Sequence, residues 1–215
     1  MLDEFKNKGF IIVRKSIPTS VVEFLDRYLV MKESVAQQVI PREAGCDCKY
    51  WGQLTDALCE TTWGNYGDVA TEVLLEIQKP IIEEVLKIES PLIPHYSYTR
   101  VYKEGDALRA HLDREACEIS STINIGGDIW PIFIKDLSGS THEASLSPGD
   151  MLVYQGVKLE HWREPFKGEH CSQVFLHYTT TNGLATGIKY DGRSQLGIPY
   201  KIGVLIKEEE EENNT

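Results

Sequence analysis

Short apolar runs rich in β-branched and aromatic residues recur through the second half of the chain and limit what it can fold into. Turns that contain Gly, Pro or Asp separate them, and the runs are HYSYTRVY, EISSTINI, WPIFIKD, MLVYQG and CSQVFLHYT. Many short strands with turn signals between them are typical of an all-β sandwich or barrel. The sequence therefore predicts a β core that begins near Pro91.

The residues before Pro91 show a helical pattern instead. GFIIVRKSI predicts a single strand that ends at Pro18. Apolar residues at helical spacing predict a helix over residues 18–40, capped by Thr19 or Ser20, and a second over residues 68–88 that Pro80 kinks or splits. Helices followed by strands indicate an α+β protein in which N-terminal helices brace one outer face of the β core.

Three regions follow from this division. Residues 1–90 form an N-terminal strand and helical support region, residues 91–206 form the β core, and residues 207–215 form an acidic tail. The tail, with its run of glutamates, is expected to be a solvated, disordered end.

Charge and composition exclude several classes of protein. The net charge of −11 has the wrong sign for a protein that neutralises nucleic-acid phosphates. No apolar run approaches the roughly 20 residues of a membrane span, and MLDEFKNKGF lacks the apolar region of a secretory signal, so a cytoplasmic protein is expected. The five cysteines are then expected to be reduced thiols, and the CxC pair Cys46 and Cys48 does not have zinc-finger spacing.

The stretch LRAHLDREACEIS contains the first candidate for chemistry, His111 and Asp113. Residues two apart on a strand project from the same face, so both side chains can reach one point. An imidazole nitrogen and a carboxylate oxygen suit a divalent first-row metal, and a second histidine would complete the facial triad of non-haem Fe(II) oxygenases. Without that third ligand the pair is only the polar side of a strand.

His161 is the candidate third ligand. It follows a Ser147–Asp150 turn, an apolar strand and a turn at Gly156, a hairpin that can return the chain beside the strand carrying His111. His142, His170, His177 and His95 are the remaining histidines. His177 is expected to be packed or exposed rather than a ligand, and His142 to be exposed in a turn.

RVYKEGDALRAHLD, with Tyr102, Gly105, His111 and Asp113 in order, resembles the approach to the metal in 2-oxoglutarate- and Fe(II)-dependent oxygenases, within the prolyl-hydroxylase-like branch. STINIGGDIWPIFI and SPGDMLVYQGVKLEHW resemble the next core strand and the stretch before the distal histidine. The resemblance covers residues 91–180. It implies that the β core is a double-stranded β-helix, a jelly-roll of the cupin-like type.

The same resemblance implies His111, Asp113 and His161 as catalytic iron ligands and Tyr102 as a hydroxyl donor to 2-oxoglutarate. The family places an Arg or Lys nine or ten residues after the distal histidine, where this chain has His170 and Cys171. His170 is therefore predicted to contact 2-oxoglutarate. Arg100, Arg163 and Lys167 are alternative partners for its carboxylate.

The implied activity is that of a dioxygenase that hydroxylates an organic substrate while 2-oxoglutarate is decarboxylated to succinate. Fe(II), 2-oxoglutarate and O2 are the implied cofactors, with ascorbate as a further candidate. A small molecule, a free amino acid or a peptidyl proline all fit as substrate, and Arg114 is a candidate substrate contact near the pocket mouth. The rival interpretations are a non-catalytic cupin-like binding protein and a cupin-type metal-dependent isomerase or hydrolase. The sequence does not give the oligomeric state.

Overall fold

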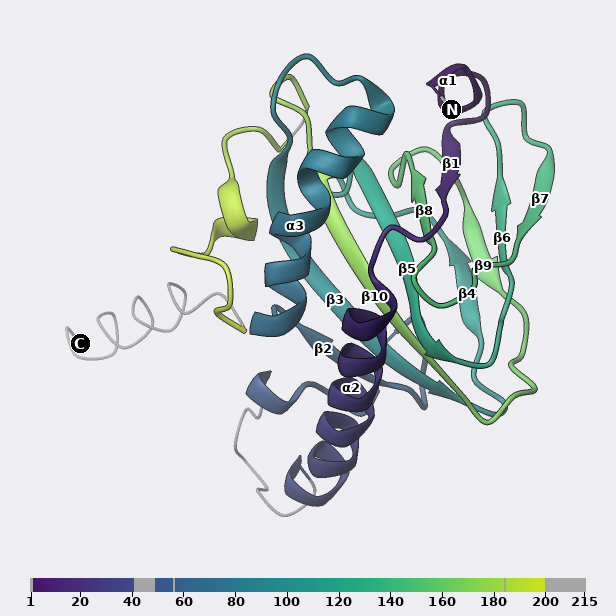
Figure 1. The fold of residues 1–215 in the computed structure, drawn as a ribbon, viewed down its shortest axis with the longest axis vertical. Helices are drawn as coiled ribbons and strands as arrows, with labels where there is room; N and C mark the ends of the chain where they lie inside the picture. The colour runs from purple at the N-terminus through teal and green to yellow at the C-terminus, as the bar shows by residue number, and fades with distance from the viewer. Residues whose placement is uncertain (1, 41–48, 56, 184, 200–215) are drawn as a thin grey trace, which may run out of the picture.

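The computed structural model describes residues 2–40, 49–55, 57–183 and 185–199, and the Cys46–Cys48 pair and the acidic tail lie outside them. Two antiparallel sheets, the major and the minor sheet, face each other and form the double-stranded β-helix core. Helices pack on the outer face of the major sheet (Figure 1). The predicted α+β class, with helices bracing a jelly-roll core, is confirmed.

The major sheet has six strands in the order β1-β8-β5-β10-β3-β2. Their bounds are β1 Phe10–Val13, β2 Trp63–Tyr66, β3 Ile93–Lys103, β5 Ile119–Gly127, β8 Met151–Tyr154 and β10 His170–Thr179. β10 lies in the middle of the sheet and pairs with β3 on one side and β5 on the other. The two strands contributed by the first 90 residues form the two edges of the sheet.

The minor sheet has four short strands in the order β4-β9-β6-β7. They are β4 Leu108–His111, β6 Ile132–Lys135, β7 Thr141–Ala144 and β9 His161–Arg163. Each of the apolar runs singled out in the sequence contributes a strand to one of the two sheets. The alternation of side chains along each strand sends one set into the space between the sheets and the other set outward.

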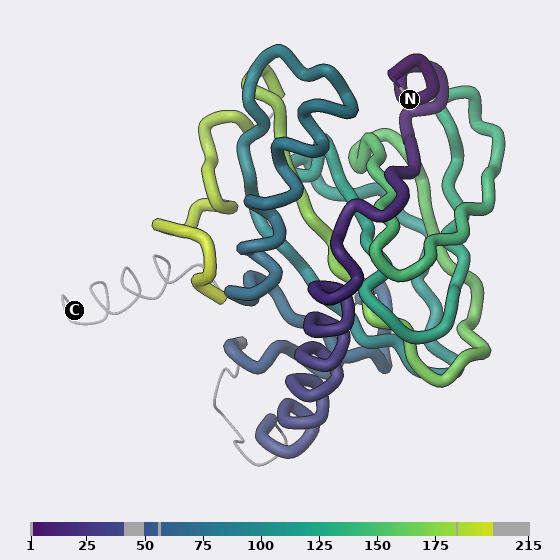
Figure 2. The backbone as a smooth tube through the Cα atoms, in the orientation of Figure 1, coloured from purple at the N-terminus to yellow at the C-terminus, as the bar shows by residue number. Residues whose placement is uncertain are grey.

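Two long helices, α2 (Thr19–Val39) and α3 (Val69–Leu86), lie on the outer face of the major sheet (Figures 1 and 2). The short helices are α1 (Leu2–Lys8), η2 (Lys49–Trp51) and η3 (Lys189–Gly192). The helix–sheet core buries Leu25 and Leu75 against Val174 and Leu176 of β10. At roughly 1.5–3 kcal/mol for each large apolar side chain removed from water, this layer is a main source of stability. It also holds β10 in place from the side opposite the interior.

Details of the N-terminal region differ from prediction. Pro80 does not split α3, which runs without interruption from Val69 to Leu86. Neither Thr19 nor Ser20 caps α2, because the N-cap position is Pro18 and no side chain accepts a hydrogen bond there. β2 was missed because WGNY is short and interrupted by Gly64, whose missing side chain lets Tyr98 of β3 lie directly against the backbone.

Candidate metal centre

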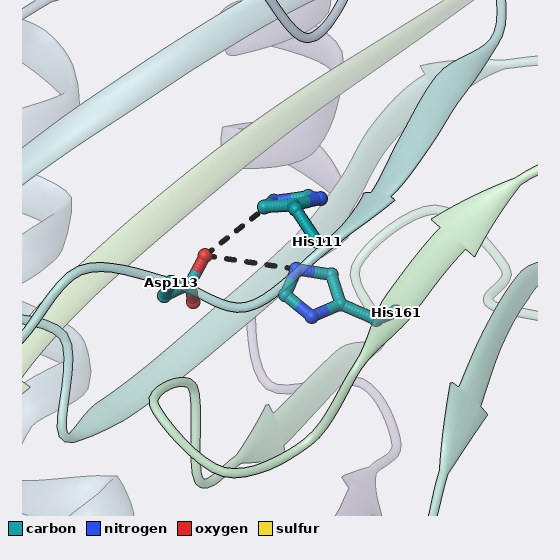
Figure 3. A group of neighbouring side chains, drawn as sticks. All are labelled: His111, Asp113 and His161. Atoms are coloured by element: carbon teal, nitrogen blue, oxygen red, sulfur yellow. Dashed lines mark ion pairs between the residues drawn. The ribbon is translucent and has the colours of Figure 1, made fainter.

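His111, Asp113 and His161 converge on one point between the two sheets (Figure 3). Asp113 Oδ1 lies 3.6 Å from Nε2 of His111 and 3.6 Å from Nε2 of His161. The two imidazole rings have centroids 4.3 Å apart, and the candidate ligand atoms all lie within 4.8 Å of one another. Two nitrogens and one oxygen on one side of a common point are the donor set of the 2-His-1-carboxylate facial triad.

The minor sheet brings the histidines together by register. His111 ends β4, His161 begins β9, and the two residues are paired across these antiparallel strands. The predicted return of the hairpin beside the first histidine is therefore confirmed. Asp113 is not on the strand, as the i, i+2 argument assumed, but in the loop after β4, where its backbone N–H donates to the carbonyl of Gly156 at 3.0 Å.

Backbone carbonyls fix the orientation of both imidazoles. His111 Nδ1 lies 2.8 Å from the carbonyl oxygen of Arg109, and His161 Nδ1 lies 2.9 Å from that of Leu159. A carbonyl can only accept, so each Nδ1 carries the proton and each Nε2 is left with a lone pair. Such outer hydrogen bonds orient metal-binding histidines in proteins. The two Nε2 atoms are therefore oriented for metal binding by the protein alone.

The two oxygens of Asp113 have separate partners. Oδ1 faces the two Nε2 atoms, whereas Oδ2 accepts a hydrogen bond from the Ser120 hydroxyl at 2.7 Å. Gly156 makes room for this arrangement, because a Cβ there would collide with both Asp113 and Ser120. One oxygen is thus free to bind a metal while the other holds the carboxylate still.

The charges in the site suit ligation at neutral pH. Burial works to raise the pKa of Asp113, but the neighbouring His111 and His161 and the Ser120 hydroxyl outweigh it and hold that pKa below its usual range. Burial lowers the pKa of His161. A carboxylate and a neutral imidazole are the forms that metal ions bind.

Ser120 connects the carboxylate to His177 on β10, whose Nδ1 is 3.0 Å from the Ser120 oxygen. The single hydroxyl proton of Ser120 goes to ionised Asp113, so Nδ1 of His177 must donate to Ser120. Burial lowers the pKa of His177 to about 4, which keeps its ring neutral. His177 is buried, one of the two environments predicted for it, and it lines the cavity over the triad.

A cavity of about 330 Å³ opens over the triad. Its walls are mostly aromatic and apolar, with a few polar groups, as is usual for small-molecule sites. The lining includes Tyr96, Tyr98, Arg100, Leu108, Tyr154, Phe175 and His177 together with the three candidate ligands.

The structure separates the two residues predicted to contact 2-oxoglutarate. Tyr102 is buried in the interior among Trp130, Phe166 and Cys171, and its hydroxyl has no hydrogen-bond partner among the described residues. His170 turns the other way, toward the helix layer, and its Nε2 lies 3.4 Å from Oδ1 of Asp26. The position of His170 therefore does not fit the predicted cosubstrate contact.

The other cations that the sequence offered take up different positions. Arg100 lines the cavity, Arg163 is buried between the sheets, and Lys167 is exposed in the loop before β10. Arg114 forms a double hydrogen bond with Asp191 of η3, at 2.9 and 2.7 Å. This ion pair ties the loop after Asp113 to the C-terminal end of the described chain, which accounts for Arg114 without a substrate.

Three residues of the site were missed in the sequence: Ser120, Tyr154 and, as a cavity wall, His177. The hydroxyl of Tyr154 lies 3.4 Å from Nε2 of His161. Strand alternation was the signal that could have found them, because Tyr154, Ser120 and His177 occupy paired positions on adjacent strands β8, β5 and β10.

Comparison with solved structures identifies the fold. A Pseudomonas putida prolyl-4-hydroxylase superposes with a TM-score of 0.62 at 13% identity, covering 83% of this chain and 96% of that one. A 2OG-Fe(II) oxygenase family oxidoreductase from Burkholderia pseudomallei gives 0.61 at 9% identity, covering 86% and 91%. HygX from Streptomyces hygroscopicus, solved with nickel and 2-oxoglutarate bound, gives 0.59 at 12% identity, covering 84% and 86%.

No protein-family profile matches the chain, and no curated protein matches its sequence. The chain thus has the fold of 2OG-Fe(II) oxygenases, including prolyl 4-hydroxylases, at low sequence identity. Its His-Asp-His cluster is consistent with an iron site. No helix in the described part of the chain is long and apolar enough to cross a membrane.

Proposed function

We propose that the protein is an Fe(II)- and 2-oxoglutarate-dependent oxygenase that hydroxylates an organic substrate and releases succinate. One observation carries the proposal: two Nε2 atoms and one carboxylate oxygen converge at the base of a cavity, and each is oriented by a further hydrogen bond. The fold, shared with 2OG-Fe(II) oxygenases, supports it.

His111, Asp113 and His161 would hold the iron. When bound with a 2-oxo acid, Fe(II) supplies the activation of O2 that C–H hydroxylation requires. The protein's own residues orient the three donors, direct Nε2 of each imidazole toward the metal position, and surround the reacting centre with aromatic walls that limit access of water. The facial arrangement leaves ligand positions open toward the cavity.

The substrate class is left broad in this proposal. A small molecule, an amino acid or a peptide can be served by the same iron and cosubstrate machinery, since the fold does not determine what is oxidised. Hydroxylation of proline is one form of the activity. It is supported by the likeness to prolyl 4-hydroxylases in fold alone.

An anaerobic titration of the metal-free protein tests the proposal. Fe(II) followed by 2-oxoglutarate should produce the weak visible charge-transfer band of the Fe(II)–2-oxo acid chelate. The band should be absent in Asp113→Ala and unchanged in Glu104→Gln, a matched loss of an exposed carboxylate in the turn after β3. Fe(II) binding without any band from any 2-oxo acid would contradict the proposal and favour a non-catalytic metal-binding protein.

A further inference from the structure

Arg163 is a buried cation with no counter-ion among the residues that the structure describes. It lies two residues after His161 on the inward face of β9, and only 2% of it is exposed. No Asp or Glu of the described chain forms an ion pair with it. Its guanidinium donates to the carbonyl of Trp130 and, at 3.3 Å, to Oε1 of Gln173, while Nε has no partner. A guanidinium stays protonated in proteins, and burying one without an anion is costly.

Tyr102 adds a second unsatisfied donor to the same place. Its hydroxyl is buried without a partner, and burial raises its pKa, so the oxygen keeps its proton. Both residues pack on Trp130: the Tyr102 ring centroid is 4.8 Å from that of Trp130, and the Arg163 guanidinium carbon is 5.0 Å from it. A cation with no carboxylate partner and an unpaired Nε, beside a hydroxyl with no acceptor among the described residues, is the complement of a carboxylate.

The distance from the triad suits one particular length of ligand. Same-face neighbours on a strand are about 6–7 Å apart, which is the expected separation of His161 from Arg163 along β9. The four C–C bonds of a five-carbon dicarboxylate span about 5 Å between its two carboxylate carbons. A 2-oxo acid chelated at the triad can therefore place its far carboxylate near Arg163.

The cavity over the triad adjoins this cluster. Phe175 lines the cavity and also packs with Tyr102 and Trp130. Leu108, another wall residue, is the cross-strand partner of Arg163. Phe175 and Leu108 thus adjoin both the cavity and the cluster that holds the two unsatisfied donors.

We propose that Arg163 and Tyr102 bind the distal carboxylate of 2-oxoglutarate in this protein, in place of a basic residue on β10. The proposal rests on the proposed function and gives it a specific cosubstrate: a dicarboxylic rather than a monocarboxylic 2-oxo acid. Cys171, the position ten after His161, faces inward beside Tyr102 and is uncharged. Arg163, on β9 of the minor sheet, supplies the positive charge that Cys171 on β10 lacks.

Affinity for two 2-oxo acids tests the assignment without reference to turnover. The metal-free protein is loaded with Fe(II) anaerobically and titrated with 2-oxoglutarate or with 2-oxobutyrate, which lacks the distal carboxylate, following the charge-transfer band. The native protein should prefer 2-oxoglutarate by roughly 10- to 100-fold, the range of a charge-assisted hydrogen-bonded pair. Arg163→Gln should remove that preference and leave the affinity for 2-oxobutyrate and for Fe(II) unchanged.

Tyr102→Phe, which removes only one oxygen, should reduce the preference by less, and it covers the case in which Arg163→Gln does not fold. His170→Ala and Lys167→Gln are the matched controls and should keep the full preference. A native protein that binds both acids equally would overturn this assignment while leaving the oxygenase proposal intact. Full preference in both Arg163→Gln and Tyr102→Phe would overturn it as well. Absence of the band with every 2-oxo acid would instead count against the proposed function.

Discussion

Two regions of the interior, the His-Asp-His triad and the cluster around Trp130, differ in how their buried polar groups are hydrogen-bonded. At the triad, every donor has an acceptor: His111 and His161 donate to backbone carbonyls, and Ser120 donates to Asp113. Around Trp130, within the described part of the chain, Arg163 has no anion and the Tyr102 hydroxyl has no partner. The protein itself preorganises the donors at the triad, whereas at Trp130 the described residues leave two donors unsatisfied, which the proposed 2-oxoglutarate carboxylate would satisfy.

This difference predicts how mutations in each region affect the protein. A preorganised site loses function when one of its internal hydrogen bonds is removed, because the remaining donors lose their orientation. An incomplete site loses little in the free protein, since the missing partner was never there. Mutations in the two regions should therefore be distinguishable by whether the ligand-free or the ligand-bound protein is affected.

The largest effect is expected from Asp113→Ala. Two imidazoles without the carboxylate lose charge balance and one of three ligands, so Fe(II) affinity should fall by more than roughly 100-fold and turnover should be lost. Isothermal titration with Fe(II) under anaerobic conditions measures this. Tyr102→Phe in the Trp130 cluster should keep the Fe(II) affinity of the native protein. An equal loss of Fe(II) affinity in the two variants would contradict the proposed difference between the triad and the Trp130 cluster.

The next effect is a dependence of stability on pH that originates at His177. Burial lowers its pKa from 6.5 to about 4, with Arg114 acting in the same direction and Asp113 in the opposite one. Between pH 6.5 and 4 the unfolded chain binds a proton that the folded protein does not. The free energy of unfolding should therefore decrease by about 3 kcal/mol through this group as the pH falls across that window.

Urea denaturation of the metal-free protein at pH 7 and pH 4 measures that decrease. His177→Gln removes the titrating group, so its decrease over the same interval should be smaller. Identical pH dependence in the native protein and the variant would show that His177 does not contribute.

A smaller effect is expected from Ser120→Ala. The variant leaves all three candidate ligands in place but removes the hydrogen bond that holds Oδ2 of Asp113. Loss of such an outer hydrogen bond lowers metal affinity by about 10- to 100-fold. Ser172→Ala, a serine on β10, is the matched control and should leave Fe(II) affinity unchanged. An unaltered affinity in Ser120→Ala would mean that the triad is held by its backbone alone.

The smallest effect is expected from His170→Ala. Its neighbour Asp26 belongs to the helix layer, and partly exposed side-chain pairs of this kind are worth about 0–1 kcal/mol. Thermal denaturation should show a shift of no more than a few degrees, and titration with 2-oxoglutarate should show no change. A clear loss of 2-oxoglutarate affinity would return His170 to the cosubstrate site.

Sequence patterns predicted the class of fold and the composition of the triad. Period-2 runs and turn signals identified strands in both sheets, although β2 and β7 were missed. The HxD pair with a later histidine after a hairpin identified three residues that the fold brings together. These signals are local, or depend on a single pairing of two strands. They do not require knowledge of which side of each strand faces inward.

The prediction for His170 depended on such knowledge, and the structure turns His170 toward Asp26 of the helix layer. His170 and Cys171 are adjacent on β10, so they point to opposite sides of the sheet, and a shift of one residue exchanges the two faces. β10 also carries register irregularities against both of its neighbours. Counting residues from His161 could not show which of the two faces the interior, nor that Arg163 would supply a charge from the other sheet.

The position of β10 has a consequence for how the protein acquires its structure. β10 is the last strand of the described chain, yet it lies between β3 and β5 in the middle of the major sheet. β1 likewise pairs with β8, which joins Phe10 to Tyr154. Contacts between residues so distant in sequence make folding slow, because the chain loses the entropy of closing long loops before the stabilising contacts form. On the ribosome, the major sheet cannot be completed until residue 179 has emerged. The apolar faces of its earlier strands should therefore stay open to aggregation for longer than in a protein built from local hairpins.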